Sequence, residues 1–597
     1  MTYAEKKKLE MAEAMQTIHA IKSSKSKWVS YRDMRPVTDL KHMIETSALL
    51  YAERPAFLYK KTHKEPYTQI TYLEFMDDIN AVGTGLISLG LKDKRIGVIG
   101  PNSYQWALSY MSVVCGTGVV VPLDKELPAE NLKEQLADAE VSAVIMDKKF
   151  RETFLEIKES GETALEILID MTAEDDDGNF LALSKIREKG AALIAGGDTS
   201  FTKAEIDNKA MSILLYTSGT TGAAKGIMLS HRNIAEDLMV SPTVLRVTPE
   251  DRFFSVLPLH HTYECTSGFL MPMYSGASIA YCEGLKYILT NMQESEPTFF
   301  LAVPAIFEMI YKKIKTNVRK SGKEKKLEKA IKINKFTKKF KIDNGDKFFK
   351  DIREIFGGKL RMMISGGAAI NPEVLDFFND VGITALQGYG LTECAPMGAL
   401  NPDIAPNSKS VGVAFPNCDA MIYEPNENGV GEICLGGANV MIGYYKRPDL
   451  TEEAIVDGWF HTGDLGYIDS EGYLYLSGRK KNVIITKNGK NVYPEELEYY
   501  LSEIPMVLES MVFEREGQVG DDHVIAASIV VDEEYIKDHY PEDPEDSVIE
   551  ADLWKEVDKI NERNPLFKQI KVIQVRRKPL AKNSSNKIVR FKEENRF

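Results

Sequence analysis

The sequence has few cysteines, no long apolar run and no excess of positive charge, and each shortage excludes a class of protein. Its six cysteines among 597 residues include no Cys-x-x-Cys pair, which is typical of reduced, buried thiols in a cytosolic protein and argues against zinc. A net charge of −14 argues against a partner that is nucleic acid. The longest uncharged run, residues 96–123, is interrupted by glycine and proline, so a membrane-spanning helix is not expected there.

The two ends of the sequence lack familiar targeting signals. The first 28 residues contain early lysines, but glutamates interrupt them and no apolar segment follows, so we expect a polar surface helix. The final residues, "EENRF", contain no prenylation box. We therefore expect a cytoplasmic protein, whose only contact with a membrane would be peripheral, at the inner surface.

Strand-like apolar runs alternate with helical stretches along most of the chain. "RIGVIGPN", "SYQWALSYMSVVCGTG" and "VVVPL" predict a strand, a helix and a strand, and "ASIAYC", "PTFFLAVP", "LRMMISGG" and "ITALQGYG" are further short runs. This alternation predicts an α/β architecture with helix-covered sheets. Because 597 residues are too many for one hydrophobic core, we expect more than one domain.

The last part of the sequence has the pattern of a small α+β domain. "DSEGYLYLSGR" predicts a hairpin with its turn at Glu471-Gly472, and the next residues predict a strand, a turn at Asn488-Gly489 and a helix that begins at Pro494. A strand, a helix and a last strand follow. We place the boundary between Lys480 and Lys481, which predicts a large N-terminal domain, 1–480, and a small, mobile C-terminal domain, 481–597.

The basic segment, residues 311–350, contains sixteen Lys or Arg and four Asp or Glu, which leaves the rest of the chain at −26. Such a segment is most often a solvated helical face. The alternative is a surface for anions, either lipid headgroups or a polyphosphate. Four phenylalanines lie among the lysines and favour an interface: Phe336, Phe340, Phe348 and Phe349.

The stretch "YTSGTTGAAKGIMLSH", residues 216–231, has the composition of an anion-binding loop. Within it, the ten residues 217–226 contain four hydroxyl side chains, three glycines and Lys225. It differs from a Walker A loop because Gly226 follows the lysine and the next residues, "GIMLS", predict a strand rather than a helix. We therefore expect a loop between two strands that binds polyphosphate through N–H groups, hydroxyls and an ammonium. The alternative is a Ser/Thr/Gly-rich surface turn.

This loop resembles the phosphate-binding motif of the adenylate-forming (AMP-binding) superfamily, which includes acyl-CoA synthetases, luciferases and peptide-synthetase adenylation domains. Ala224 stands where the family usually has proline. Five further segments resemble the family's motifs in the family's order: "LPLHHTYE", "ISGGAAI" with "QGYGLTEC", "GWFHTGDLGYIDSEGYLYLSGR", "NGKNVYPEELE" and "PLAKNSSNKIVR". The match extends from about residue 50 to the end. It implies the adenylate-forming enzyme fold and an ATP site.

The resemblance assigns residues to that ATP site. Adenylation joins a carboxylate to the α-phosphate of ATP, so cations and hydrogen-bond donors must be placed where negative charge gathers. Glu393 is predicted to bind Mg²⁺ with support from Thr392, and His261 to border the acyl pocket. The remaining predicted ATP contacts are Thr217, Ser218, Gly219, Thr220, Thr221, Gly222, Lys225, Gly367, Ala368, Gly388, Tyr389, Gly390, Asp464 and Arg479. The alternatives are that Glu393 caps a helix, that Tyr389 is a core residue, and that Asp464 and Arg479 form surface ion pairs.

The C-terminal motif predicts the residue that carries adenylation. Lys587 is expected to bridge the acyl carboxylate and the α-phosphate, although Asn586 replaces the family's usual glycine and a solvated lysine is the alternative. Rotation about a hinge at Lys481 would then bring Gly489 and Lys490 to the CoA side. We expect His260 to be structural, because adjacent residues on a strand point to opposite faces and cannot easily share a metal.

The predicted function is an acid–thiol ligase that activates a medium- to long-chain fatty acid. ATP and CoA are its co-substrates and Mg²⁺ its metal. The basic segment resembles long-chain acyl-CoA synthetases more than short-chain or aryl-acid members. Three alternatives stay open: an acyl-AMP ligase that loads a carrier protein, an aryl or small-acid CoA ligase, and a non-catalytic nucleotide-gated membrane-binding protein.

Overall fold

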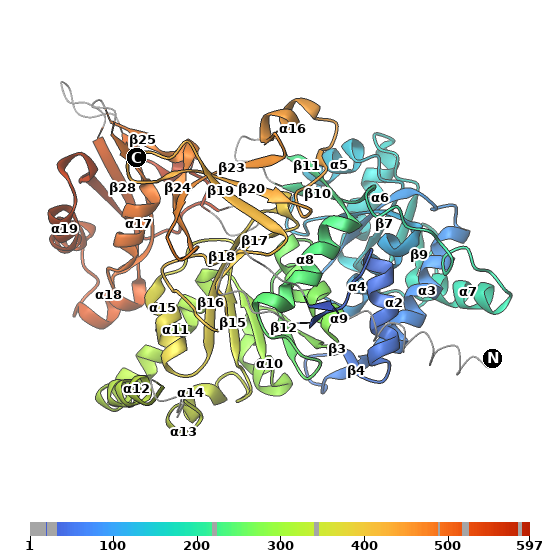
Figure 1. Cartoon of the computed structure of the whole chain (residues 1–597), viewed down its shortest axis with the longest axis horizontal. Helices are drawn as coiled ribbons and strands as arrows, with labels where there is room; N and C mark the ends of the chain where they lie inside the picture. Colours follow the sequence, from blue (N-terminus) through green and yellow to red (C-terminus); the bar gives the residue numbers. More distant parts are fainter. Residues whose placement is uncertain are drawn as a thin grey trace. The chain divides into compact units, whose positions relative to one another are not determined.

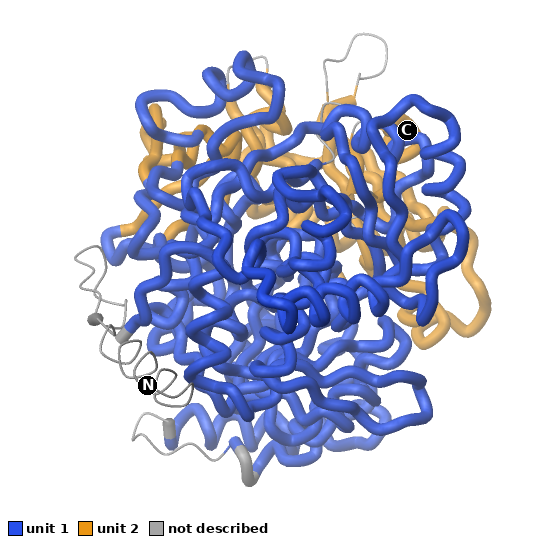
Figure 2. Tube along the Cα trace, turned by 90° about the vertical axis from the view of Figure 1, so that its right-hand side faces the viewer, with its two compact units in different colours: residues 1–420, 435–460, 470–473 blue, residues 421–434, 461–469, 474–597 orange. Residues whose placement is uncertain are grey.

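The structure, a computed structural model, describes residues 19–20, 33–217, 224–338, 345–486, 490–515, 524–582, 588–590 and 592–597. Of the predicted N-terminal surface helix, residues 1–28, only His19–Ala20 are described, and they form a short strand, β1, that pairs with β2 (Asp33–Met34). Two compact units divide the chain (Figure 2): unit 1 comprises residues 1–420, 435–460 and 470–473, and unit 2 comprises residues 421–434, 461–469 and 474–597. Each unit is described by itself.

Unit 1 contains two large sheets covered by helices (Figure 1). The first has eight strands in the order β21 (Gly443–Tyr444), β11 (Lys225–Ser230), β10 (Met211–Thr217), β6 (Gly118–Pro122), β5 (Lys94–Ile99), β7 (Ala143–Met146), β8 (Ile167–Asp170) and β9 (Phe180–Ala182). Its strands are parallel except at β10–β11 and β11–β21. Helices α5 (Ala129–Asp138) and α6 (Arg151–Ser160) bury apolar side chains against it.

The second sheet of unit 1 has nine strands. Their order is β18 (Val413–Ala414), β17 (Met397–Leu400), β16 (Thr384–Gly390), β15 (Met362–Ser365), β14 (Phe299–Ala302), β12 (Arg252–Ser255), β13 (Ser278–Tyr281), β3 (Pro55–Tyr59) and β4 (Thr68–Thr71). The strands from β3 to β16 are parallel. The helices of unit 1 are α2 (Leu40–Tyr51), α3 (Tyr72–Ser88), α4 (Tyr104–Ser112), α7 (Leu183–Ala195), α8 (His231–Val244), α9 (Met271–Ser275), α10 (Ile288–Ser295), α11 (Pro304–Lys320), α12 (Glu324–Lys338), α13 (Gly345–Phe348), α14 (Lys350–Glu354), α15 (Pro372–Asp380) and α16 (Pro448–Ala454).

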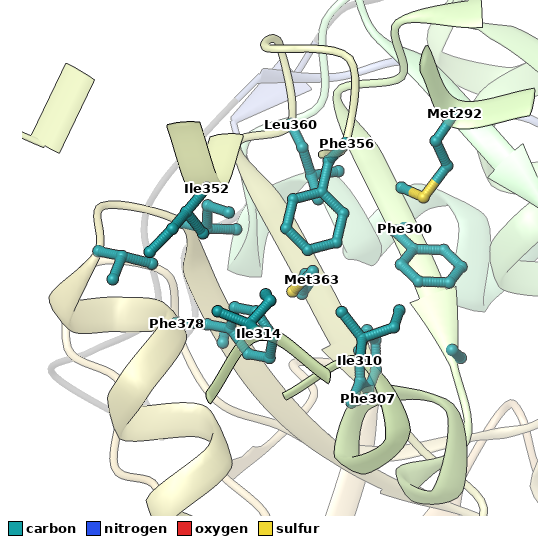
Figure 3. Packing of buried hydrophobic residues seen from close by; sticks show 14 of the residues in the cluster. Met292, Phe300, Phe307, Ile310, Ile314, Ile352, Phe356, Leu360, Met363 and Phe378 are labelled. Carbon is teal, nitrogen blue, oxygen red and sulfur yellow. The ribbon is translucent and has the colours of Figure 1, made fainter. Parts of the chain in front are cut away.

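The basic segment begins on a helix that is anchored in the core. On α11, Phe307, Ile310 and Ile314 are buried at helical spacing, and they pack with Phe300 of β14 (Figure 3). Helix α12 has only a shallow apolar contact with this cluster, through Leu327, Ala330 and Ile331. The lysines of α12 therefore lie on a helix whose opposite face is packed. Phe340 lies outside the described residues.

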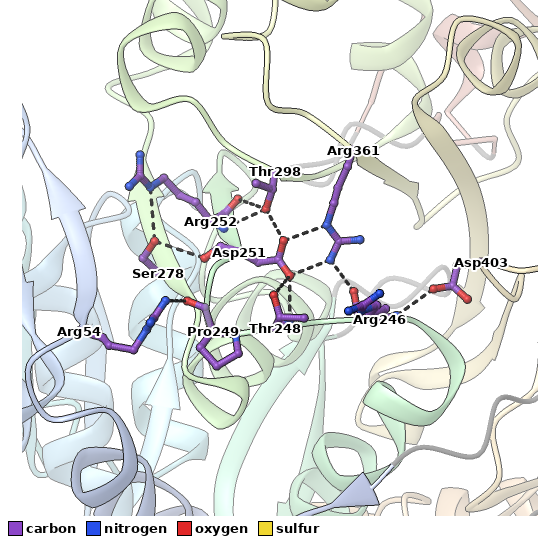
Figure 4. Close-up of polar contacts among 10 residues, drawn as sticks. All are labelled: Arg54, Arg246, Thr248, Pro249, Asp251, Arg252, Ser278, Thr298, Arg361 and Asp403. Atoms are coloured by element: carbon purple, nitrogen blue, oxygen red, sulfur yellow. Dashed lines mark hydrogen bonds and ion pairs between the residues drawn. The ribbon is translucent and has the colours of Figure 1, made fainter. Parts of the chain in front are cut away.

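A polar network ties the amino-terminal ends of the parallel strands together (Figure 4). Asp251 precedes β12, and its carboxylate accepts hydrogen bonds from Arg361 Nε at 2.9 Å, Arg361 Nη2 at 2.7 Å and Thr298 Oγ1 at 2.7 Å. Arg361 precedes β15 and Thr298 precedes β14, so one buried carboxylate joins three strands. Burial opposes ionisation, but these hydrogen bonds outweigh it and lower the pKa of Asp251. The predicted ATP site is therefore expected at the opposite edge of this sheet, where the parallel strands end.

Unit 2 ends in a three-stranded sheet with a layer on each face. The strands are β27 (Val507–Arg515), β28 (Val524–Val531) and β29 (Ile570–Arg576), and α17 (Pro494–Ser502), α18 (Glu533–His539) and α19 (Asp546–Arg563) bury one face. Leu580, Ile588 and Phe597 from the C-terminal tail cover the other face. The chain reaches this sheet through the short pair β25 (Ile484–Ile485) and β26 (Asn491–Val492).

A further sheet is formed by strands that lie before residue 480 in the sequence. Its strands are β19 (Cys418–Tyr423), β20 (Gly431–Gly437), β23 (Trp459–Ile468) and β22 (Ile455–Val456), with β24 (Leu474–Arg479) paired to β23. The predicted hairpin is confirmed, since Ile468 pairs with Leu474 and Gly472 adopts a positive φ of 92° in the turn. The expected α/β fold class is confirmed as well. The boundary at Lys480–Lys481 stays a prediction.

Candidate active site

The predicted phosphate loop connects two antiparallel strands, as its sequence indicates. Thr217 at the end of β10 pairs with Lys225 at the start of β11. The next helix, α8, begins only after Ser230, whose hydroxyl accepts the N–H of Asn233 as an N-cap. The loop itself lies outside the described residues, with these predicted contacts: Ser218, Gly219, Thr220, Thr221 and Gly222.

Glu393 lies in a short 3₁₀ turn, Thr392–Cys394, directly after β16. The hydroxyl of Tyr444 donates to Glu393 Oε1 at 3.1 Å, and burial and this carboxylate both raise the pKa of Tyr444, so the phenol keeps its proton. The ammonium of Lys225 lies 5.1 Å from the centroid of the same ring. One tyrosine therefore links the lysine of the predicted phosphate loop with the predicted metal ligand.

Buried polar groups support the turn that carries Glu393. Asn439 is fully buried and donates to the carbonyl oxygens of Cys394, at 3.2 Å, and Met397, at 2.6 Å. The Asp237 carboxyl accepts the N–H of Met397 at 3.1 Å, and burial raises the pKa of this carboxyl well above its usual value. Because both sides of the turn are hydrogen-bonded to buried side chains, the backbone around Glu393 is well defined.

The histidine motif lies beside Thr392. Thr262 donates to the Thr392 hydroxyl at 3.4 Å, and it immediately follows His261. After it comes a π-helix, Tyr263–Leu270, an element that is frequent at functional sites. The structure therefore brings His261 and the Thr392–Glu393 turn into one neighbourhood, although Thr262 and Thr392 are 130 positions apart in sequence.

The expectation that His260 and His261 lie on a strand and point to opposite faces is wrong. Both lie in a turn after β12, because the strand ends at Ser255, and their ring centroids are 4.3 Å apart. Burial lowers the pKa of His260 to about 3, and the neighbouring His261 adds to the effect. His260 is therefore neutral near pH 7, and its 3.5 Å approach to Asp124 is not an ion pair there.

The predicted adenine segments lie on neighbouring parallel strands. Gly367 and Ala368 follow β15 and are exposed, and Gly367 has a positive φ of 83°. Gly388, Tyr389 and Gly390 form the end of β16, whose Gln387 pairs with Ser365 of β15. A Cβ on Gly390 would lie 1.8 Å from the carbonyl oxygen of Pro396, so only glycine fits this position. Tyr389 is 9% exposed.

The predicted ribose residues face each other within unit 2. Asp464 of β23 pairs with Arg479 of β24, and Arg479 Nε donates to Asp464 Oδ1 at 3.0 Å. Beside them the Glu432 carboxylate accepts Lys480 Nζ at 2.9 Å and the N–H of Gly463 at 3.1 Å. Burial opposes ionisation of Glu432, but its hydrogen bonds with Lys480 and His461 outweigh it and lower its pKa. Glu432 thus holds the residues next to Asp464 and Arg479.

The remaining predicted residues lie further along unit 2. Lys481 is exposed in a 3₁₀ turn that follows β24. Lys490 is exposed, and its backbone pairs with Thr486 at 3.0 Å and 3.1 Å, which closes the β25–β26 connection. Gly489 and Lys587 lie outside the described residues.

Tyr444 and Glu432 are the functional candidates that the sequence motifs did not reveal. Both belong to stretches outside the quoted motifs, and each acts through a hydrogen bond to a residue 31 or more positions away. The only local signal for Tyr444 is its glycine-rich approach, "GGANVMIGYY". Such a pattern does not reveal which carboxylate the phenol will contact.

A magnesium ion fits the chemistry of these residues. In nucleotide enzymes Mg²⁺ is typically bound by one or two carboxylates together with phosphate oxygens, and Glu393 is a partly exposed carboxylate with a fixed orientation. Within the described ranges, no cluster of three or more His, Cys, Asp or Glu side chains could hold a metal by itself. The phosphates would therefore supply the other ligands.

Comparison with known proteins agrees with the motifs. A family model described as "AMP-binding enzyme" matches residues 44–445, and one described as "AMP-binding enzyme C-terminal domain" matches residues 481–597. The chain belongs to the AMP-binding enzyme family, and the expected membership is confirmed. Among curated relatives, long-chain-fatty-acid–CoA ligase 5 of Rattus norvegicus is 31% identical over 495 residues, which is 77% of this chain and 71% of that protein.

Solved structures show the same fold. An anthranilate CoA ligase in complex with anthranoyl-AMP aligns over 93% of this chain and 96% of that chain, with 19% identity and a TM-score of 0.74. An o-succinylbenzoate CoA synthetase of Bacillus subtilis, in complex with ATP and magnesium ion, aligns over 92% of this chain and 98% of that chain, with 22% identity and a TM-score of 0.68. None of the helices in the described ranges combines the length and apolarity needed to span a bilayer.

Proposed function

We propose that this protein is an ATP-dependent acid–thiol ligase that converts a medium- to long-chain fatty acid into its acyl-CoA, with release of AMP and pyrophosphate. The observation that best supports this proposal is the group formed by Lys225, Tyr444 and Glu393, in which one tyrosine contacts both a cation and a carboxylate. The curated relative named as a long-chain-fatty-acid–CoA ligase supports the substrate class.

In the first step, an oxygen of the fatty carboxylate attacks the α-phosphorus of ATP, and the bond to pyrophosphate breaks. The loop from Thr217 to Lys225 donates hydrogen bonds to the phosphates, and Lys225 offsets their charge. A magnesium ion bound at Glu393 supplies further charge neutralisation. Tyr389 borders the adenine, while Asp464 accepts from the ribose hydroxyls with Arg479 beside it.

Lys587 brings the two reacting anions together. Its ammonium attracts both the carboxylate and the α-phosphate, which otherwise repel each other. In the second step the CoA sulfur attacks the acyl carbon and AMP leaves. Since Lys587 blocks that approach, the small domain turns about Lys481 and presents the side with Gly489 and Lys490.

Half-reaction assays test these roles. Lys587→Ala is expected to abolish acyl-adenylate formation, measured as fatty-acid-dependent exchange of pyrophosphate into ATP, while thiolysis of supplied acyl-adenylate continues. Equal loss of both half-reactions would contradict the assignment of Lys587 to the first step.

A panel of carboxylic acids, assayed for pyrophosphate release with and without CoA, tests the substrate class. We expect release with medium- and long-chain fatty acids, and AMP release that requires CoA. Preference for aryl or small acids would instead indicate an aryl or small-acid CoA ligase, such as the anthranilate CoA ligase. Acyl-AMP that CoA cannot discharge would indicate a ligase that loads a carrier protein.

We also propose that α12 contacts anionic lipid at the inner membrane surface, where fatty acids partition. Ile333 and Phe336 are 41% and 61% exposed on this helix, between lysines that are exposed as well. Exposed apolar side chains flanked by lysines are typical of an interfacial helix. Flotation with vesicles of phosphatidylcholine alone and with 30 mol% phosphatidylserine, about the range of anionic membranes, tests this. Equal binding to both would exclude an electrostatic contact.

A further inference from the structure

The C-terminal tail contains a buried asparagine that joins the two arms of the loop carrying Lys587. Asn595 is 0% exposed. Its side-chain amide donates to the carbonyl oxygens of Ala581, at 3.0 Å, and Val589, at 2.9 Å, and its side-chain oxygen accepts the N–H of Ala581 at 2.7 Å. Ala581 precedes residues 583–587 in sequence and Val589 follows them. One side chain therefore binds the backbone on both sides of the five-residue segment that ends at Lys587.

The two arms also contact each other directly. The N–H of Val589 donates to the carbonyl oxygen of Ala581 at 2.9 Å, and Lys582 and Ile588 form an antiparallel bridge. Lys582 and Ile588, the described residues on either side of positions 583–587, are thus held next to each other. Only five residues of sequence separate these two fixed points.

Asn595 is fixed to the centre of the small domain. Its backbone carbonyl accepts the hydroxyl of Ser528 at 2.9 Å, and Ser528 is a fully buried residue of the central strand β28. Around it, Leu580 and Ile588 pack on the tail-covered face of the sheet. The loop arms therefore belong to the folded sheet of this domain.

Two ion pairs hold the outer sides of the arms. On the first arm, the Glu509 carboxylate pairs with Lys582 and accepts the N–H of Leu580 at 3.2 Å. On the second arm, Arg590 pairs with Glu498 and donates to the carbonyl oxygen of Val512 at 3.0 Å. Both acidic partners lie on elements that pack against the sheet or form it, α17 and β27. The first arm is therefore tied to a strand of the sheet and the second to a helix packed on it, and Asn595 is their common link.

We propose that Asn595 is a positioning residue for adenylation, because its hydrogen bonds to both arms hold the loop of Lys587 in the geometry that the first step needs. This inference rests on the proposed role of Lys587. Asn595 touches no substrate in this scheme and acts only through the backbone of the loop. A displacement of about 1 Å at a reacting group lowers rates on the order of a hundredfold, so loss of the clamp should affect adenylation selectively.

The chain offers a matched control in the same domain. Asn561 is 9% exposed and makes the same kind of double contact with backbone, donating to the carbonyl oxygen of Ile570 at 2.9 Å and accepting the N–H of Ile570 at 2.9 Å. It fixes the start of β29 rather than the loop of Lys587. Asn561→Ala therefore removes a comparable buried amide without touching either arm.

The test compares full-length Asn595→Ala and Asn561→Ala in both half-reactions. For Asn595→Ala we expect the turnover of fatty-acid-dependent ATP–pyrophosphate exchange to fall about ten- to a hundredfold. The KM for ATP should stay within about twofold of the wild-type value, and the rate of thiolysis of supplied acyl-adenylate within about threefold. These are order-of-magnitude limits for an interaction that acts only in the first step. Asn561→Ala should lower thermal stability without this selective loss. Wild-type exchange in Asn595→Ala, equal loss in both half-reactions, or the same selective loss in Asn561→Ala would each overturn the proposal.

Two further variants keep the outcome interpretable. Glu509→Gln retains the side-chain shape and the acceptor for the N–H of Leu580 but removes the ion pair with Lys582. It should lower the exchange rate, but by less than Asn595→Ala does. Unchanged exchange in Glu509→Gln, together with an unfolded Asn595→Ala, would overturn the proposed role of Asn595. Lys587→Ala separates the two hypotheses. If Lys587→Ala retains exchange, the proposed role of the lysine is wrong; if only Asn595→Ala retains it, the clamp alone is wrong.

Discussion

Replacement of Tyr444 by phenylalanine tests whether the orientation of Glu393 matters for adenylation. The substitution removes the hydroxyl that donates to Glu393 Oε1 at 3.1 Å, but it keeps the ring that lies 5.1 Å from the ammonium of Lys225. It therefore separates the hydrogen bond from the cation–π contact. Because burial raises the pKa of this phenol, the hydroxyl is a neutral donor at every pH at which the enzyme would be assayed.

The expected size of the effect follows from the type of hydrogen bond. A hydrogen bond to a charged group contributes about 1.5–3 kcal/mol. Because Glu393 is partly exposed, screening by solvent reduces this contribution to about 1–2 kcal/mol. Each 1.4 kcal/mol corresponds to about a tenfold change in rate, so kcat/KM for adenylation should fall about 5- to 30-fold.

ATP–pyrophosphate exchange at varied magnesium concentration is the assay. If the hydroxyl orients a magnesium ligand, the loss should be largest at limiting magnesium and smaller at saturation. Tyr445→Phe is the control, because Tyr445 is the neighbouring tyrosine and its backbone, not its hydroxyl, contacts Gly226 at 2.7 Å. A loss below about twofold in Tyr444→Phe, or an equal loss in Tyr445→Phe, would refute the reasoning, since the calculated effect exceeds both.

Four further substitutions, the last two a matched pair, test other parts of the structure. Burial raises the pKa of Glu264 to about 8, so in the folded state this carboxyl keeps a proton that the unfolded state loses above its own, lower pKa. The stability gained by Glu264→Gln should therefore grow as pH rises from 5 to 8, by up to about 1.4 kcal/mol per pH unit in urea unfolding. A stability difference that does not change with pH would contradict this. Arg361→Leu leaves the buried carboxylate of Asp251 without its main partner and should lower the free energy of unfolding by about 2–4 kcal/mol; a change below about 1 kcal/mol would show that the network is unimportant. Phe336→Glu should reduce vesicle binding without a change in thermal stability, because Phe336 is exposed. Phe307→Ala should lower the free energy of unfolding by about 3–5 kcal/mol, because Phe307 is buried. The reverse pattern would contradict the assignment of Phe336 to the surface and Phe307 to the core.

Local patterns predicted many elements correctly because each pattern reflects a requirement within a few residues. Apolar runs of four to seven residues became the buried strands β5, β13, β14, β15 and β16. Local residue types also predicted the strand that begins at Lys225 and the helix that follows its N-cap Ser230. The strand in place of a helix after the lysine correctly excluded a Walker A loop. Where local reasoning assumed a strand that was not there, at His260 and His261, it failed, because the strand had already ended at Ser255.

The sequence by itself determined the family, the order of the motifs and the strands that carry them, since these depend on residue types at short spacings. Only the tertiary structure decided that Tyr444 would reach Glu393, 51 residues away, and that Asn595 would join Ala581 to Val589. A hydrogen bond needs its two atoms within about 3 Å, and the chain between them passes through whole strands and helices whose packing sets that distance. Spacing in sequence cannot encode such contacts, so supporting residues emerge only when the fold is known.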